Sequence, residues 1–223
     1  MGRLVRRIEA RVGVPIDIEE TYDWIAFVPN RTNGSGALTK YFGIGAGGWK
    51  IRGVESRQHS TCDWVRRLQQ QSLELLRESP DEEAQTAVVE HLHEQLELLS
   101  SGRVPLLDLI VARRVRREVE DTRVANLTTA ALRRAASLER RIPPGHKVRF
   151  AVVGWRRRDL IDRVRLRSEI AAGCDSVRGQ AGDVAHYAPL AVRAVSAVLS
   201  PFGWSDARIE AGSSRQVSMD MWT

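Results

Sequence analysis

Two pairs of carboxylates have a spacing that would allow metal-dependent chemistry. Asp17 and Glu19 are separated by one residue in a stretch of alternating apolar and polar side chains, so a strand would place both on one face. Close carboxylates of this kind hold the divalent ions that catalyse phosphoryl transfer. The exposed face of a strand explains this pair more simply. Asp159 and Asp162 stand three positions apart among arginines, and ion pairing along a helix accounts for them better than a metal does.

The histidines, cysteines and glycines form no motif that indicates catalysis. His91 and His93 are two positions apart in a helical pattern, so we expect them on different sides of the helix and solvated. Cys62 and Cys174 lack the spacing of a zinc site or of a disulfide framework, which indicates two reduced thiols. The glycine-rich stretch 43–48 lies between predicted strands and is expected to be a hairpin tip. We therefore expect neither a catalytic residue nor a metal ligand in this chain.

Composition is typical of a folded protein. The chain has 223 residues, of which 43% are hydrophobic, enough for one large or two small domains. Apolar runs are all shorter than the roughly 18 residues that would span a bilayer, and the basic N-terminus lacks the apolar core of a signal peptide. The sequence thus predicts a cytoplasmic protein that does not contact membranes.

Charge is distributed unevenly along the chain. The formal net charge is +6, but residues 61–102 carry three basic and nine acidic side chains, for a net charge of −6. Residues 103–178 carry nineteen basic and nine acidic side chains, for a net charge of +10. A basic block beside an acidic one is expected of a protein that lays one side on a polyanion, although solvated helix faces would give the same counts.

The first 60 residues are predicted to form a helix followed by antiparallel strands. Apolar residues recur with a helical period from residue 3 to residue 12, and proline at position 15 ends the pattern. A few strands alone would leave unpaired edges, so we expect another polypeptide to complete this sheet. The predicted strands cover residues 16–20, 22–28, 38–43 and 49–54.

Beyond residue 60 the pattern becomes mostly helical. Ser60 or Thr61 is expected to cap a first helix, and Ser79 followed by Pro80 and three acids marks the start of a second. Gly102 is the natural end of that second helix. The sequence therefore predicts an α+β fold with a partial antiparallel sheet in residues 1–60 and a mostly helical domain in residues 61–223. Further helices are predicted at 113–121, 128–141 and 183–199, and a strand at 147–153.

Six short motifs occur along the chain in a fixed order with characteristic gaps. Together they resemble the C-terminal third of a family B DNA polymerase of the archaeal type, which comprises the end of the palm and the whole thumb. Each motif alone has little specificity, whereas the ordered set covers nearly the whole chain. The motifs are Lys40-Tyr41, Arg52-Gly53-Val54-Glu55, the segment 142–148, the segment from Asp183 to Tyr187, Phe202-Gly203-Trp204, and the segment 214–219.

The resemblance implies a part of an enzyme whose catalytic carboxylates lie elsewhere. In the family, one of the metal-binding carboxylates lies in a Tyr-Gly-Asp-Thr-Asp-like hairpin of the palm, and this chain contains no Asp-x-Asp. We therefore expect magnesium only in the complete enzyme, and a large partner chain with the exonuclease, the fingers and the metal-binding palm. The alternative is a polymerase-derived module that clamps duplex DNA without catalysis.

The resemblance also implies which side chains hold primer–template duplex. Tyr41 is equally compatible with packing under the sheet, and the arginines around Val115 with a solvated face. For the terminal motif, the resemblance implies phosphate or minor-groove contact from Arg215. The expected DNA-binding residues are Lys40, Tyr41, Arg52, Arg57, Arg113, Arg114, Arg116, Arg117, Arg215 and Gln216.

Overall fold

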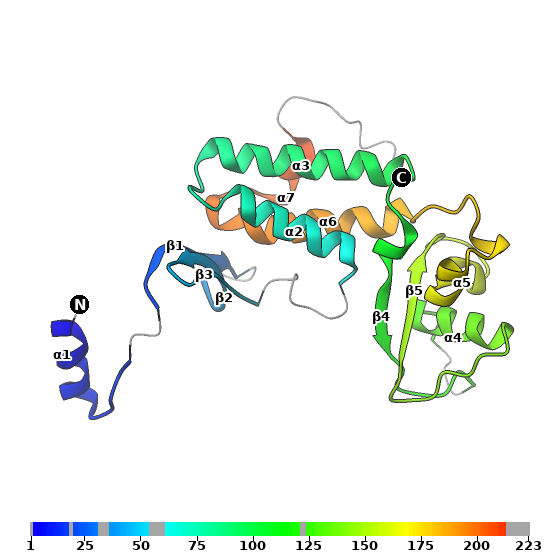
Figure 1. The fold of residues 1–223 in the computed structure, drawn as a ribbon, viewed down its shortest axis with the longest axis horizontal. Coiled ribbons are helices and arrows are strands. Elements are labelled where there is room, and N and C mark those ends of the chain that lie inside the picture. Colours follow the sequence, from blue (N-terminus) through cyan, green and yellow to red (C-terminus); the bar gives the residue numbers. More distant parts are fainter. Residues whose placement is uncertain (1, 18–19, 31–35, 54–60, 121–123, 213–223) are drawn as a thin grey trace. The chain divides into compact units, whose positions relative to one another are not determined.

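The computed structural model describes residues 2–17, 20–30, 36–53, 61–120 and 124–212 (Figure 1). The chain divides into two compact units, residues 1–53 and 54–223, and each contains helix and antiparallel sheet. The α+β fold class predicted from the sequence is therefore confirmed. The predicted boundary after residue 60 adjoins the segment 54–60, which lies outside the described residues. The assignment of the two parts to palm and thumb stays a prediction.

The first unit is one helix and a three-stranded antiparallel sheet. Helix α1 (Gly2–Val12) precedes strands β1 (Tyr22–Pro29), β2 (Gly36–Gly45) and β3 (Gly48–Arg52), with β2 in the middle. Trp24 packs edge-on against both Phe42 and Trp49, so aromatic side chains from all three strands hold the sheet together. The predicted helix, the three strands from residue 22 onward and the hairpin between β2 and β3 are confirmed.

The strand predicted at residues 16–20 is wrong. Ile16, Asp17 and Glu20 lie outside any strand, and Ile18 and Glu19 are outside the described residues. The Ile16 amide donates to the Glu9 carboxylate of α1 (3.0 Å), and Glu20 forms an ion pair with Lys50 of β3 (3.6 Å). The Ile16 amide is therefore bonded to a side chain and not to a neighbouring strand.

The second unit contains a bundle of helices. Its members α2 (Asp63–Leu75), α3 (Glu82–Ser100) and α6 (Val184–Leu199) pack on one another, and the short helix α7 (Asp206–Ala211) packs on α6 (Figure 1). Buried leucines and valines fill the space between them, and the buried Gln69 amide donates to the Ala194 carbonyl oxygen (2.8 Å). Within the described part of the chain, no helix is long and apolar enough to cross a membrane.

Two helix starts differ from the predicted ones by a few residues. The N-cap of α2 is Cys62, which follows Thr61, and Ser60 lies outside the described residues. The N-cap of α3 is Asp81 and not Ser79, because the Asp81 carboxylate accepts the Ala84 amide (2.9 Å). Gly102 follows the C-cap of α3 with a φ of 69°, a left-handed conformation that suits glycine.

A second three-stranded antiparallel sheet follows the bundle's first two helices. Its order is β4 (Val111–Arg114), β5 (Lys147–Val152) and β6 (Val164–Leu166), so β4 is an edge strand. The predicted strand at 147–153 is confirmed as β5, and the helices predicted at 128–141 and 183–199 are confirmed as α4 and α6. The elements beside this sheet are α4 (Leu127–Ser137), α5 (Arg167–Ala172), and the 3₁₀ turns η2 (Leu106–Leu109), η3 (Ile161–Arg163) and η4 (Asp175–Val177).

The helix predicted at residues 113–121 is wrong, because this segment begins as strand β4. Arg113 pairs with Val148 and Arg114 with Lys147, and the Val115 amide extends the pairing by donating to the His146 carbonyl oxygen (2.8 Å). Val111 and Val115 stand four positions apart and are both buried, which imitates a helical period. Pairing with a strand more than thirty residues later overrides that local pattern.

Tyr187 connects the helical bundle to the second sheet. Its side chain is completely buried, donates to the Leu109 carbonyl oxygen (2.7 Å) and accepts the Val152 amide (2.9 Å). Burial raises the pKa of this phenol, so it remains a neutral donor. The first turn of α6 is therefore fixed to the end of β5 and to η2.

Candidate nucleic-acid interface

Four of the predicted DNA-binding arginines lie together at the edge of the second sheet. Arg113 and Arg114 end strand β4, and Arg116 and Arg117 follow Val115 directly. All four arginine side chains are exposed, whereas Val115 is buried and anchors the segment. Among the described residues no acidic side chain forms an ion pair with any of the four. Guanidinium groups that lie close together without an ion-pair partner repel one another, so binding of an anion would be favourable here.

The arginines border a groove between the edge strand and helix α4. The groove has a volume of about 410 Å³ and is open to solvent on one side. Asn126 begins its other wall as the N-cap of α4, where the side-chain oxygen accepts the Thr129 amide (2.9 Å). The Thr129 hydroxyl donates to the Val124 carbonyl oxygen, so these two polar groups of the wall are already hydrogen-bonded within the chain. The lining residues are Ala112, Arg113, Arg114, Arg116, Arg117, Asn126, Thr128, Thr129 and Leu132.

Two further basic residues belong to this surface and were missed in the sequence. Lys147 pairs with Arg114 and Arg149 pairs with Ala112, so the three basic side chains share one face of the β4–β5 strand pair. Both Lys147 and Arg149 are exposed. The sequence does contain a signal for this surface, because basic residues occupy alternate positions of the predicted strand 147–153. Their position beside Arg114 depends on the register with β4, which the sequence pattern did not reveal.

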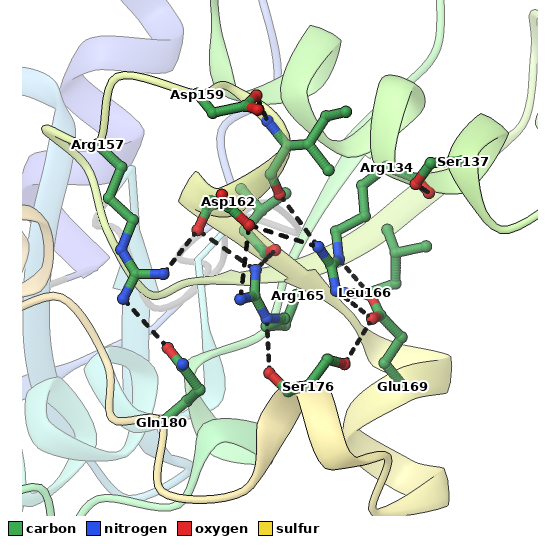
Figure 2. Close-up of polar contacts among 12 residues, drawn as sticks. Arg134, Ser137, Arg157, Asp159, Asp162, Arg165, Leu166, Glu169, Ser176 and Gln180 are labelled. Carbon is green, nitrogen blue, oxygen red and sulfur yellow. Dashed lines mark hydrogen bonds and ion pairs between the residues drawn. The ribbon is translucent and has the colours of Figure 1, made fainter.

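Helix α4 is held in place by a buried ion-pair network (Figure 2). Arg134 of α4 donates to both carboxylate oxygens of Glu169, at 2.8 and 2.6 Å. Glu169 also accepts the Leu166 amide (2.9 Å) and the Ser176 hydroxyl (3.1 Å), and Arg165 donates to backbone carbonyl oxygens, including that of Ser176 (2.9 Å). The groove wall formed by α4 is thus fastened to β6 and α5.

The electrostatics of this network favour an ionised Glu169. Burial by itself would raise the pKa of Glu169, but hydrogen bonds from the Arg134 guanidinium and the Leu166 amide outweigh burial and lower that pKa below its usual range. Burial and the positive charge of Arg134 lower the pKa of Arg165. The positive charges of two buried arginines are therefore offset by one buried carboxylate. The more exposed Asp162 lies 4.0 Å from Arg134 and 3.9 Å from Arg165.

The first unit brings three other predicted residues close together. Tyr41 and Arg52 are paired across β2 and β3, and Lys40 is the exposed neighbour of Tyr41. Tyr41 is half-buried and packs against Phe27 with ring centroids 5.7 Å apart, which is the packing role that the sequence also allowed. Arg52 is exposed. The predicted contacts of Arg57, Arg215 and Gln216 lie outside the described residues.

The acidic and histidine pairs singled out in the sequence have mostly structural contacts. Asp162 forms ion pairs with Arg134 and Arg165, so the predicted pairing with arginines is confirmed for Asp162, although from the 3₁₀ turn η3 and not from an α-helix. Asp159 instead accepts the Ile161 amide (3.0 Å). His93 is partly buried and lies 3.1 Å from the Ile209 carbonyl oxygen, so it is not simply solvated. Across the described ranges, no group of three or more His, Cys, Asp or Glu side chains is arranged to hold a metal ion.

Comparison with known proteins identifies the fold. No protein-family model and no curated protein matches the chain. Among solved structures, the chain is similar to the family B DNA polymerase from the hyperthermophilic archaeon Pyrobaculum calidifontis, with a TM-score of 0.62 and 22% sequence identity. The similarity covers 92% of this chain and 24% of the polymerase chain. The chain therefore has the fold of a part of that polymerase and spans about a quarter of its length.

Proposed function

We propose that the chain is the DNA-holding C-terminal part of a family B DNA polymerase, formed by the end of the palm and the thumb. The observation that carries the proposal is the groove beside β4, where four exposed arginines have no acidic partner within the described segments. The ordered motifs and the fold shared with a polymerase support the same assignment. In this role the chain grips primer–template duplex while a larger chain adds nucleotides.

The groove is suited to the phosphate backbone of DNA. A guanidinium group can donate two parallel hydrogen bonds to phosphate oxygens, so each arginine combines charge with a defined geometry. Lys147 and Arg149 extend the same positive surface along β5. Contacts to phosphates carry no direct information about base sequence, which is what an enzyme that accepts any template requires.

An exposed apolar surface on the first unit supports a protein partner. Leu4, Ile8 and Val12 stand four positions apart on α1 and are all exposed, and Ile25 and Phe27 of β1 are exposed as well. β1 and β3 are both edge strands of their sheet. In the proposed assembly a large polymerase chain with the exonuclease, the fingers and the metal-binding palm covers this surface. The catalytic magnesium ions belong to that chain, so no chemical step is assigned to the residues of this one.

The proposal is tested by measuring how salt affects binding of a duplex. The purified chain is expected to bind blunt duplexes of different sequence with similar affinity. If about four to six phosphates are neutralised, the logarithm of the association constant should fall against the logarithm of salt concentration with a slope of roughly −4 to −5. Fluorescence anisotropy between about 50 and 200 mM salt gives this slope, since that range spans the loss expected from several phosphate contacts.

Two results would contradict this part of the proposal. A slope near zero would mean that the arginines form a solvated surface. A strong preference for one duplex sequence would mean that base edges are read, which phosphate contacts alone do not achieve.

A further inference from the structure

An exposed tryptophan, Trp155, follows strand β5 and lies beside the first turn of α6. The Trp155 side chain is 43% exposed, whereas Trp204 in the helical bundle is 7% exposed. A large aromatic ring that is both accessible and held in place offers a flat surface to a flat ligand. The contacts of Trp155 show that it is held in place.

One carboxylate binds the backbone amides of the two residues whose rings stack on each other. Asp183 accepts the Trp155 amide (2.6 Å) with one oxygen and the His186 amide (2.9 Å) with the other. The Trp155 and His186 rings stack with centroids 5.4 Å apart and planes inclined by 30°. His186 in turn meets the fully buried Tyr187 edge-on at 4.8 Å. A continuous series of rings therefore runs from the core to the surface, and Trp155 is its outermost member.

Several arginines accompany this ring pair, beside the Asp183 carboxylate. Burial lowers the pKa of His186 and outweighs the Asp183 carboxylate, which raises it, while the charge of Arg113 adds to the lowering, so the imidazole is neutral at neutral pH. Three exposed arginines, 156–158, follow Trp155 directly. Figure 2 shows that Arg157 reaches the Asp162 carbonyl oxygen and the Gln180 side chain, both at 3.4 Å, which holds this loop against the sheet.

We infer that Trp155, supported by His186, is a stacking platform for an unpaired base of single-stranded DNA, with Arg113 and the arginines at 156–158 holding the adjacent phosphates. A base inside a duplex is covered on both faces by its neighbours, whereas every base of a single strand can expose a face to a side chain. The surrounding cations favour a polyanionic strand over an uncharged aromatic ligand. The inference rests on the proposed function and adds a single-stranded segment to its ligand.

The test compares single-stranded and duplex binding by the full chain and by its variants. The single-stranded probe is a fluorescein-labelled oligothymidylate of twelve nucleotides, and the duplex probe is a blunt duplex of sixteen base pairs. Trp155→Ala is expected to weaken oligothymidylate binding about fivefold or more, since stacking on an aromatic side chain contributes substantially for each base. Duplex binding should change less than about twofold, because only the two terminal base pairs of the duplex expose a face and all other bases are covered on both sides.

Two companion variants keep the test decisive. Trp155→Phe preserves an aromatic face and should retain most of the single-strand affinity, and it remains informative if the alanine variant fails to fold. Leu107→Ala removes another exposed apolar side chain of the same unit and should leave both affinities unchanged. Addition of oligothymidylate should quench tryptophan fluorescence in the wild type more than in Trp155→Phe.

The possible outcomes separate this inference from the proposed function. Unchanged oligothymidylate binding by Trp155→Ala, or an equal loss on the duplex, overturns the stacking platform. A wild-type chain that binds duplex but no oligothymidylate also overturns it and leaves the proposed function intact. Binding of oligothymidylate that depends on Trp155, without any duplex binding, supports the platform and contradicts the proposed grip on duplex.

Discussion

Replacing Glu169 by alanine is expected to lower the free energy of unfolding by about 3–5 kcal/mol, the cost of breaking a buried ion pair by removing one partner. Arg134 and Arg165 are 8% and 5% exposed, and Glu169 is the only carboxylate buried with them among the described residues. Without it, two guanidinium groups are left buried near each other with only the half-exposed Asp162 close by. Urea denaturation followed by circular dichroism measures the loss.

A matched control distinguishes this network from a surface ion pair. Glu94 lies on α3 with a side chain that is 73% exposed and 3.7 Å from His91, and Glu94→Ala makes the same chemical change. We expect it to alter stability by less than about 1 kcal/mol, as for exposed pairs in general. Equal stability of the two variants would contradict the structural role given to Glu169.

The same network predicts a loss of stability in acid. Glu169 has a lowered pKa in the folded chain, so its contribution is fully present above the pKa of an unfolded glutamate, about 4.3. The contribution disappears as the pH falls through the lowered folded value. Between pH 5 and pH 2 the wild type should therefore lose stability more steeply than Glu169→Ala.

Replacing the four groove arginines by alanine together is expected to reduce duplex affinity more than tenfold at about 0.1 M salt. Each lost phosphate contact should reduce the salt slope by about one, so the slope should become less negative by roughly three to four. The melting temperature should stay nearly constant, because all four side chains are exposed. Anisotropy titrations at several salt concentrations measure both effects. The four are Arg113, Arg114, Arg116 and Arg117.

A control with the same change in net charge tests whether position matters. A second variant replaces four other exposed arginines, each of which already forms an ion pair with an acidic side chain, by alanine. We expect it to keep most of the affinity and of the salt slope. If both variants lose affinity equally, net charge and not the groove explains binding. The four control positions are Arg66, Arg77, Arg141 and Arg178.

Long periodic segments made the helical bundle predictable from the sequence. The helices α2, α3 and α6 each carry apolar residues on one side over three or more turns, and the Asp183 cap of α6 lies where the pattern begins. The arginines from 113 to 117 were recognised as an exposed cluster because so many charges around one valine cannot all be buried. Their surface position needed no knowledge of the secondary structure.

The contacts that escaped prediction join residues far apart in the chain. Residues 113–121 were predicted to be a helix, but Arg113 and Arg114 end strand β4, and only pairing with β5 decides this. The same register puts Lys147 and Arg149 beside the groove. Arg134 and Glu169 are 35 positions apart, so no local pattern could associate them. Such contacts depend on the fold itself and leave no trace in the pattern of a single segment.

The most direct measurement of the proposed function is primer extension by this chain alone and with its natural partner. The tagged chain is purified from its own host at low salt, the protein that accompanies it is sequenced, and primed template is supplied with magnesium and nucleotides. We predict that the chain alone extends no primer, and that the partner carries the Asp-x-Asp carboxylates of a polymerase palm and the pair extends the primer. Extension by the rigorously pure chain alone, or a stable pair without extension activity, would contradict the account.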